Sequence, residues 1–573
     1  MKSWNLLLVF FLVGAANLYA ITDSLPLALS ANHSDLVYGR FRQEAAMRFA
    51  VNRLPGNVKD WDKYRAELRK EIIKKTGAII NHELPIDIKK LSELKMPGYL
   101  IQNIIFQGRP GGYATANLFI PDGKGPFPAV INLHAHSGRF DDDDQGVGHS
   151  LALNGYVCLS VDPWGAGERT TIHGKEEYHG ASLGASFFNI GESLMGAQIS
   201  DNIRGVDLLC SLPYVDAKNI GAAGASGGGN QTMWLAAADG RIKAADPVVS
   251  VGTFEAYVMR DNCICETLID GLTFTEEAGV LALVSPGAIQ LCNHLKDEGP
   301  SFFPSEMLRS YHNALPVFKM MGVEKNIDYK IFDLPHGYLA QDRQAMLGWF
   351  DLHLKGIGNG EPKAEIPYKI LHDGELMVFP KGKRDSSVYT TASYCKKIGS
   401  ELRSEMLHAT AIDQPKKKKE LNKILRSESS EAIKEIHYYT SESGWERMAI
   451  ETAGGKLIPL LIQLPKQASL GYTLLINPKG KKSIPAEIIE SHQKKGSGIV
   501  LLDLSGTGEA ASATADKMDD NTPFHTMSRA SLWLGQTSMG EWVKELRLTL
   551  SFLATKYGAK KVVIDGSGET GLA

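Results

Sequence analysis

The sequence predicts an α/β fold: a mostly parallel sheet with helices on both faces, followed by a second, incomplete domain of the same kind. Three observations lead to this prediction. Short apolar runs, typical of strands buried on both faces, alternate with helix-like segments between residues 98 and 356. A glycine-rich strand-turn-helix pattern lies within that stretch. Sequence similar to its opening half returns after residue 435.

The amino-terminal residues have the pattern of a signal peptide. Lys2 precedes an apolar run over residues 6–16, and Ala20 offers a cleavage point, which predicts a signal peptide over residues 1–20. The run is too short for a stable membrane span, so the mature protein is expected to be periplasmic or secreted. A net charge of −3 over 573 residues gives no reason to expect a nucleic-acid partner.

Residues 21–97 are predicted to be mainly helical, because apolar residues recur three and four positions apart. From residue 98 the period shortens, and the domain over residues 98–356 is expected to hold strands at 99–106, 114–120, 129–134, 156–161, 220–223 and 288–292. Helices are expected between and after them, at 199–212, 304–321 and 345–355. Residues 357–435 are polar, include four consecutive lysines, and are predicted to form a linker.

Residues 436–573 are predicted to be a degenerate, truncated copy of the first domain's opening half. Residues 496–509 (GSGIVLLDLSGTGE) match residues 155–168 (GYVCLSVDPWGAGE), and the correspondence continues along the chain with only small gaps. Gly566 then aligns with Gly224, but Gly568 stands where the first copy has Ser226. The later strands are missing, so either the chain is truncated or this half-domain is completed by packing on the first. Residues 566–571 (GSGETG) match the glycine pattern of dinucleotide-binding proteins. In such proteins a helix follows the glycines and binds the pyrophosphate, and no helix is expected here, so no nucleotide cofactor is predicted.

Residues 224–228 (GASGG) follow a strand-like run and precede a helix-like one. This is the context of a nucleophile elbow, in which Ser226 would occupy a strained turn with its hydroxyl exposed. Flanking glycines suit such a turn because a Cβ would collide with the neighbouring strand and helix. Residues 180–184 (GASLG) have the same pattern, but no strand precedes them, and they are set aside as a chance match.

A nucleophilic serine needs a base and a group that orients the base. His336 lies in a loop between a strand-like segment and the last helix, the position of the base in an α/β-hydrolase. The acid should follow the strand that ends near Cys292, where Asp297 is the leading candidate. The sequence leaves three alternatives open: Glu298, Glu266 and Asp246.

The oxyanion hole needs two backbone N–H groups. One is expected from Gly227 and the other from Ala135, in the loop over residues 134–138 (HAHSG). His134 and His136 in that loop lack a clear third ligand, and Cys263 with Cys265 supply too few ligands by themselves, so no metal is predicted. The acidic run over residues 141–144 is expected to be a solvated loop, and Cys158, Cys210 and Cys292 to be buried thiols.

These motifs, together with residues 162–168 (DPWGAGE) and 336–338 (HGY), resemble exported bacterial α/β-hydrolases of the acetyl xylan esterase-related kind. The resemblance implies a serine esterase that hydrolyses acetyl or related esters of polysaccharide, with a carbohydrate ester or other small ester as substrate and no cofactor. A peptidase of the prolyl oligopeptidase type is an alternative, although the residues before Gly98 are too few for its propeller. A second alternative is an inactive, hydrolase-fold binding protein, against which Ser226 and His336 argue.

Overall fold

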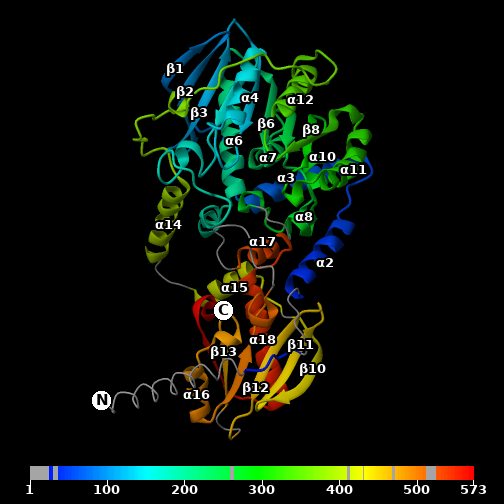
Figure 1. Ribbon diagram of the computed structural model, residues 1–573, viewed down its shortest axis with the longest axis vertical. Helices are drawn as coiled ribbons and strands as arrows, with labels where there is room; N and C mark the ends of the chain where they lie inside the picture. Colours follow the sequence, from blue (N-terminus) through cyan, green and yellow to red (C-terminus); the bar gives the residue numbers. More distant parts are fainter. Residues whose placement is uncertain are drawn as a thin grey trace, which may run out of the picture.

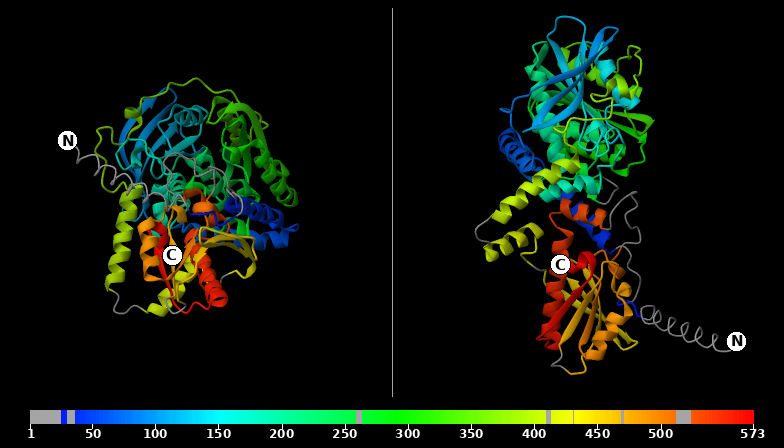
Figure 2. Two further views of the ribbon diagram at one scale, coloured as in Figure 1. Left: turned by 60° about the horizontal axis from the view of Figure 1, so that its bottom comes forward. Right: turned by 90° about the vertical axis from the view of Figure 1, so that its left-hand side faces the viewer.

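In the computed structural model the chain folds into two α/β bodies, stacked end to end (Figures 1 and 2). The structure describes residues 25–29, 36–258, 263–408, 413–429, 431–467, 471–511 and 524–573. The predicted signal peptide over residues 1–20 lies outside the described residues. Among the helices that are described, none has the length and apolar character that a membrane crossing requires.

The first body contains a nine-stranded, mostly parallel sheet with the strand order β1-β2-β3-β5-β4-β6-β7-β8-β9. Pairing is antiparallel from β1 to β5 and parallel from β5 through β4 to β9. This arrangement confirms the predicted α/β-hydrolase fold. Its strands are β1 (Lys89–Met96), β2 (Tyr99–Arg109), β3 (Gly112–Pro121), β4 (Phe127–Leu133), β5 (Val157–Val161), β6 (Val215–Ala225), β7 (Ile242–Val248), β8 (Ala288–Lys296) and β9 (Ile327–Pro335).

Helices cover both faces of this sheet, and each face has its own apolar cluster. One face packs against α4 (Asp142–Leu153) and α12 (Ala340–Phe350). The larger cluster, on the other face, includes residues of α2 (Leu36–Val51), α3 (Val58–Thr76), α6 (Leu194–Ser211), α7 (Gly227–Ala238), α8 (Phe254–Val258), α10 (Glu277–Leu283) and α11 (Pro304–Met320). Because both faces are covered, the central strands can be apolar throughout.

Several elements differ from the sequence-based expectation. The region over residues 21–97 is not wholly helical, since β1 pairs with β2 at the sheet edge. Residues 357–435 are not simply a linker, because they contain α13 (Asp373–Leu376), α14 (Thr391–His408) and α15 (Gln414–Leu425). Asp141 is the N-cap of α4, and residues 142–144 form its first turn, where carboxylates interact favourably with the helix dipole. The expected solvated loop is therefore the start of a helix.

The second body has a six-stranded sheet with the order β10-β11-β12-β14-β13-β15. This repeats the order β1-β2-β3-β5-β4-β6 of the first sheet strand for strand. Its elements are β10 (Ile433–Glu442), β11 (Trp445–Thr452), β12 (Leu457–Gln463), β13 (Tyr472–Ile476), β14 (Gly498–Leu502), β15 (Val562–Gly566), α16 (Ala486–Lys495), α17 (His525–Trp533) and α18 (Ser538–Tyr557). A second α/β domain is therefore present, as the internal repeat predicts.

The strand register aligns the two sheets residue by residue. Leu133 pairs with Gly224 in the first sheet, and Ile476 pairs with Gly566 in the second. Two residues further on, Ser226 has a φ of 56° and Gly568 a φ of 53°. The left-handed turn of the elbow thus occurs in both domains, although only the first has a serine there.

The helix α15 is the second domain's counterpart of α3. The hydroxyl of Ser193 caps α6 and donates to the last carbonyl of α3, at Thr76. In the second domain the hydroxyl of Thr537 caps α18 and donates to the carbonyl of Leu425, the last residue of α15. The repeat therefore begins with α15, inside the stretch predicted to be a linker, and not at residue 436.

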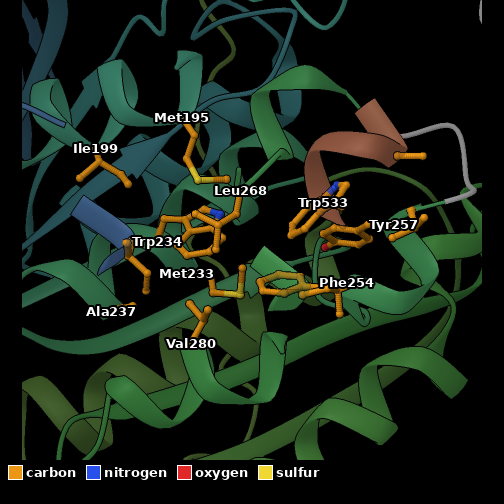
Figure 3. Close-up of a cluster of buried hydrophobic side chains, with 14 of the residues drawn as sticks. Met195, Ile199, Met233, Trp234, Ala237, Phe254, Tyr257, Leu268, Val280 and Trp533 are labelled. Atoms are coloured by element: carbon orange, nitrogen blue, oxygen red, sulfur yellow. The ribbon is translucent and has the colours of Figure 1, made fainter. Parts of the chain in front are cut away.

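The two domains share a continuous apolar interior at α17. Trp533 at the end of α17 is fully buried, and its ring centroid lies 4.6 Å from that of Phe254 and 5.9 Å from that of Tyr257 (Figure 3). Asp270 reinforces the junction, since its carboxylate pairs with Arg426 and its N–H donates to the Leu532 carbonyl, 2.8 Å away. Helices α2 and α17 lie between the two sheets in Figure 1.

Candidate active site

Ser226 lies at the sharp turn between β6 and α7, where the sequence places the nucleophile. Its backbone has φ 56° and ψ −125°, a strained conformation for a residue with a side chain. A Cβ at Gly224 would lie 2.5 Å from the Leu133 carbonyl oxygen, so glycine is needed for the strands and helix to approach this closely. The N–H of Ser226 donates to the Val248 carbonyl at 2.9 Å, which fixes the turn to β7.

His336 and Asp297 lie side by side. Nδ1 of His336, in the loop after β9, lies 2.8 Å from Oδ2 of Asp297, in the loop after β8. The Asp297 side chain is 1% exposed, and its other oxygen accepts from the Gly299 N–H at 2.7 Å. The carboxylate is therefore held rigidly, as is required of a group that orients an imidazole.

All three predicted residues follow carboxyl ends of parallel strands, at one edge of the sheet. The structure joins His336 to Asp297 but shows no hydrogen bond between the described Ser226 hydroxyl and the His336 ring. The His336 side chain is 38% exposed and lies in a loop, so the ring is partly open to solvent. In ligand-free enzymes such catalytic hydrogen bonds are often long and tighten when substrate binds.

The alternative acids have other surroundings. Glu266 accepts from the N–H of Cys263 at 3.1 Å. Asp246, within β7, lies 3.6 Å from the Cys292 thiol, and burial raises the pKa of its carboxyl well above the ordinary value. Glu298 is exposed. None of the three contacts His336 in the described part of the chain, so Asp297 remains the acid that the geometry favours.

The residues predicted for the oxyanion hole lie next to each other. A Cβ at Gly227 would be 3.4 Å from the Cβ of Ala135, so the two backbones are adjacent. Neither N–H finds a hydrogen-bond acceptor among the described residues, and both are therefore available to a ligand. The Ala135 loop is held by Gln231, whose side chain donates to the His134 carbonyl at 2.7 Å, and by Asp144, 3.1 Å from the His134 ring.

A polar cavity of about 590 Å³ opens beside this loop. It is lined by His136 and Ser137 and extends along the start of α4. Four carboxylates and one lysine face it: Asp141, Asp142, Glu176, Asp373 and Lys175. Ser226, His336 and Asp297 do not line it, so the cavity adjoins the proposed catalytic residues through the oxyanion loop and does not contain them.

The sequence did not reveal a group of side chains on the other side of His136. Its Nε2 lies 3.2 Å from the Cys263 thiol, and Cys265 lies in the same cluster. The ring of His136 also stacks obliquely on His179, with centroids 4.5 Å apart. In the sequence the histidines and the cysteine pair are separate weak signals, because 127 residues separate His136 from Cys263 and no spacing rule connects them.

Comparison with known proteins identifies a family that part of this chain resembles. Residues 72–255 match the family model described as acetyl xylan esterase (AXE1), a range that includes Ser226 and the oxyanion loop and ends before Asp297. The first domain is an acetyl xylan esterase-related hydrolase. Its class of activity is carboxylic ester hydrolysis.

Individual proteins are similar to this hydrolase over parts of its length. "Putative hydrolase YtaP" of Bacillus subtilis (strain 168) is 28% identical over 211 residues, which are 35% of this chain and 68% of that protein. Among solved structures, Methylesterase BT1017 is 21% identical with a TM-score of 0.45, covering 68% of this chain and 80% of its own. Acetyl xylan esterase from Paenibacillus sp. R4 is 17% identical with a TM-score of 0.40, covering 54% and 99%.

Proposed function

We propose that the first domain is a serine esterase with Ser226 as nucleophile, His336 as base and Asp297 as the acid that orients the base. The observation that carries this proposal is the 2.8 Å contact between the His336 ring and the buried Asp297 carboxylate, at the strand edge that also holds the strained turn of Ser226. A retained base–acid pair is costly to keep in an inactive domain, because it holds a buried carboxylate in restricted geometry.

The reaction would proceed in two steps. The Ser226 oxygen attacks the ester carbonyl while the free nitrogen of His336 takes its proton. Asp297 keeps the proton on Nδ1 and stabilises the imidazolium that forms. The N–H groups of Gly227 and Ala135 donate to the oxyanion of the tetrahedral intermediate. His336 then protonates the departing alcohol, and a water molecule hydrolyses the acyl-enzyme.

We further propose acetyl esters of a polysaccharide as substrates. The cavity beside the oxyanion loop is lined mostly by polar groups, and its four carboxylates accept hydrogen bonds from sugar hydroxyls. The same carboxylates would repel a sugar that carries its own carboxylate, as a uronic acid released from its ester does, whereas the sugar released from an acetyl ester is neutral. Neutral acetylated sugars are therefore favoured over uronic acid derivatives. A polysaccharide substrate also fits export to the periplasm or outside, as the amino-terminal pattern predicts.

The test compares Ser226→Ala with Ser182→Ala, since Ser182 is an exposed serine in the second match to the same motif. Hydrolysis of an aryl acetate and labelling by a fluorophosphonate probe should both disappear in Ser226→Ala and persist in Ser182→Ala. Equal activity of Ser226→Ala and the parent protein would refute the proposal. The substrate is then identified by comparing the rates of hydrolysis of acetylated xylan, glucuronoyl esters and feruloyl esters. Faster hydrolysis of either of the last two would refute the assignment of acetyl esters but not the assignment of Ser226 as nucleophile.

A further inference from the structure

A compact group of nitrogen and sulfur ligands lies beside the proposed oxyanion loop and has no role in the esterase chemistry. His136, Cys263 and Cys265 each present one ligand atom, and these atoms all lie within 4.8 Å of one another. The closest pair is Nε2 of His136 and Sγ of Cys263, 3.2 Å apart. Both cysteines are free thiols in the structure.

The backbone is built to bring both thiols to this place. Cys263 caps a short 3-10 helix (Ile264–Glu266), and its N–H donates to the Glu266 carboxylate at 3.1 Å. The N–H of Ile264 donates to the Gly180 carbonyl at 2.8 Å, which fixes this helix to the neighbouring loop. A Cβ at Gly180 would lie 2.8 Å from the Cys263 sulfur. Glycine at this position is thus required for the loop to pass the thiol.

We propose that His136, Cys263 and Cys265 bind one zinc ion, with the fourth coordination position open towards the polar cavity. Two cysteines and one histidine plus an exchangeable ligand is an established zinc coordination set. Zinc–sulfur distances of about 2.3 Å and zinc–nitrogen distances of about 2.0–2.1 Å place tetrahedral ligand atoms roughly 3.5–3.8 Å apart. The observed separations, from 3.2 Å for the closest pair to at most 4.8 Å within the group, bracket that spacing.

The chemistry of the ligands selects the ion. Thiolate and imidazole ligands favour zinc over magnesium or calcium, which require oxygen ligands. Binding releases the two thiol protons, so the ion and two thiolates carry no net charge at a largely enclosed position. Four-coordinate zinc keeps a water in the position that the protein leaves open, and His136 lines the cavity into which that position faces.

Such an ion would join two loops that the sequence separates. It would connect the loop of residues 134–138 to the 3-10 helix at Cys263–Glu266, and so restrain Ala135, the neighbour of His136 in the chain and of Gly227 in space. The ion is thereby a clamp on the oxyanion loop and a ligand site on the cavity wall.

The experiment measures metal content and cobalt spectra of the full-length chain, so it does not depend on esterase activity. The purified protein is expected to hold about one zinc per chain, and cobalt(II) in its place should give an intense thiolate-to-metal absorption band and tetrahedral visible bands. Loss of an outer-shell partner lowers zinc affinity by roughly 10–100-fold. Removal of a ligand should cost more, so we expect a larger loss of zinc affinity in each of the variants Cys263→Ser, Cys265→Ser and His136→Gln. Cys210→Ser, at a free thiol outside the cluster, should bind zinc like the parent protein.

Two results would overturn the inference. One is metal content that is the same in the parent protein and in a Cys263→Ser, Cys265→Ser double variant whose circular dichroism shows a folded chain. The other is a disulfide between Cys263 and Cys265 in the protein isolated from its native compartment, found by thiol counting before and after reduction. Either result leaves the esterase proposal intact, because Ser226 and His336 are not altered.

Discussion

The two α/β domains of this chain share a backbone arrangement but differ in the atoms to which we assign catalysis. Strand register makes Leu133 equivalent to Ile476, and the residues two positions later are Ala135 and Pro478. Proline has no N–H, so the second domain lacks the proposed oxyanion donor as well as the serine. The positive φ of the turn nevertheless persists at Gly568. The turn is therefore a requirement of strand and helix packing, and the second domain lacks the side chain and the N–H to which we assign catalysis in the first.

A buried ion cluster is common to both domains and therefore has a structural role that does not depend on catalysis. Arg139 pairs with Asp162 and Glu168 in the first domain, and Lys481 pairs with Asp503 and Glu509 in the second. Both cations are 1% exposed. They lie in equivalent segments, Arg139 in the one after β4 and Lys481 in the one after β13. This cluster stabilises the loop after the strand whether or not that loop takes part in catalysis.

The largest difference between the domains should appear when the two elbows are altered in turn. Ser226→Ala is expected to lower kcat by about 10⁴–10⁶-fold, because the nucleophile is removed while binding persists. Gly568→Ala should leave kcat unchanged, although its positive φ strains any residue with a Cβ. Steady-state kinetics on an aryl acetate measures both. A loss of kcat in Gly568→Ala would mean that the second domain contributes to catalysis.

The equivalent cations provide the next test. Arg139→Met leaves two buried carboxylates without their cation and should destabilise the first domain by about 3–5 kcal/mol. Lys481→Met should cost the second domain a similar amount while kcat at low temperature is kept. Urea titration followed by both activity and tryptophan fluorescence separates the two transitions. If both variants lowered the same transition equally, the domains would not unfold as separate units.

The junction between the domains can be broken at Trp533. Trp533→Ala removes a ring that packs on Phe254 and should cost about 3–5 kcal/mol, mostly as lost coupling between the domains. Scanning calorimetry should then show two transitions further apart than in the parent protein. Trp542→Ala is the matched control, because that ring is buried in the second domain and its Nε1 donates to the Ser505 carbonyl. An equal effect of both variants on the first domain would contradict a specific role of Trp533.

The smallest expected effect concerns acid stability. Burial lowers the pKa of His149, in α4, to about 4, whereas an unfolded histidine titrates near 6.5. The unfolded state therefore takes the proton first as the pH falls, so stability present above about pH 6.5 is lost progressively towards pH 4. His149→Gln should weaken this dependence by about 1–3 kcal/mol. Denaturation at several pH values checks the prediction.

His437→Gln in β10 offers the control for that titration, since His437 lies in the second sheet and pairs with Glu451. It should leave the pH dependence of the first domain's transition unaltered. A pH dependence in His149→Gln identical to that of the parent protein would show that other groups determine the acid sensitivity.

Much of the fold and of the candidate site could be predicted from the sequence, because apolar runs and glycine turns are local signals. The strand β7 was missed, since Asp246 and Pro247 within it are residues that strands usually avoid. The strand β1 was missed because it is an exposed edge strand with a charged sequence (KKLSELKM). The lysine run of residues 416–419 concealed α15, whose role is visible only in its contact with α18.

The site residues differ in the same way: some could be predicted from local sequence motifs, and others depend on contacts between distant segments. Ser226 and His336 stand in recognisable local motifs, and Asp297 follows the expected strand. The approach of His136 to Cys263 depends on how two distant loops fold against each other, and no pattern along the chain encodes it. The glycines of residues 180–184 have a physical reason in that same approach, since Gly184 leaves room for Ile264 as Gly180 does for Cys263.

The placement of Trp533 has a practical consequence for anyone who wishes to produce the esterase domain alone. Cutting the chain after α14 would expose the apolar surface of Phe254 and Tyr257, on which the indole of Trp533 now packs (Figure 3). It would also remove Arg426, the partner of Asp270. A first domain produced alone would therefore need polar replacements at this surface to stay in solution, whereas the natural chain covers it with a residue of its second domain.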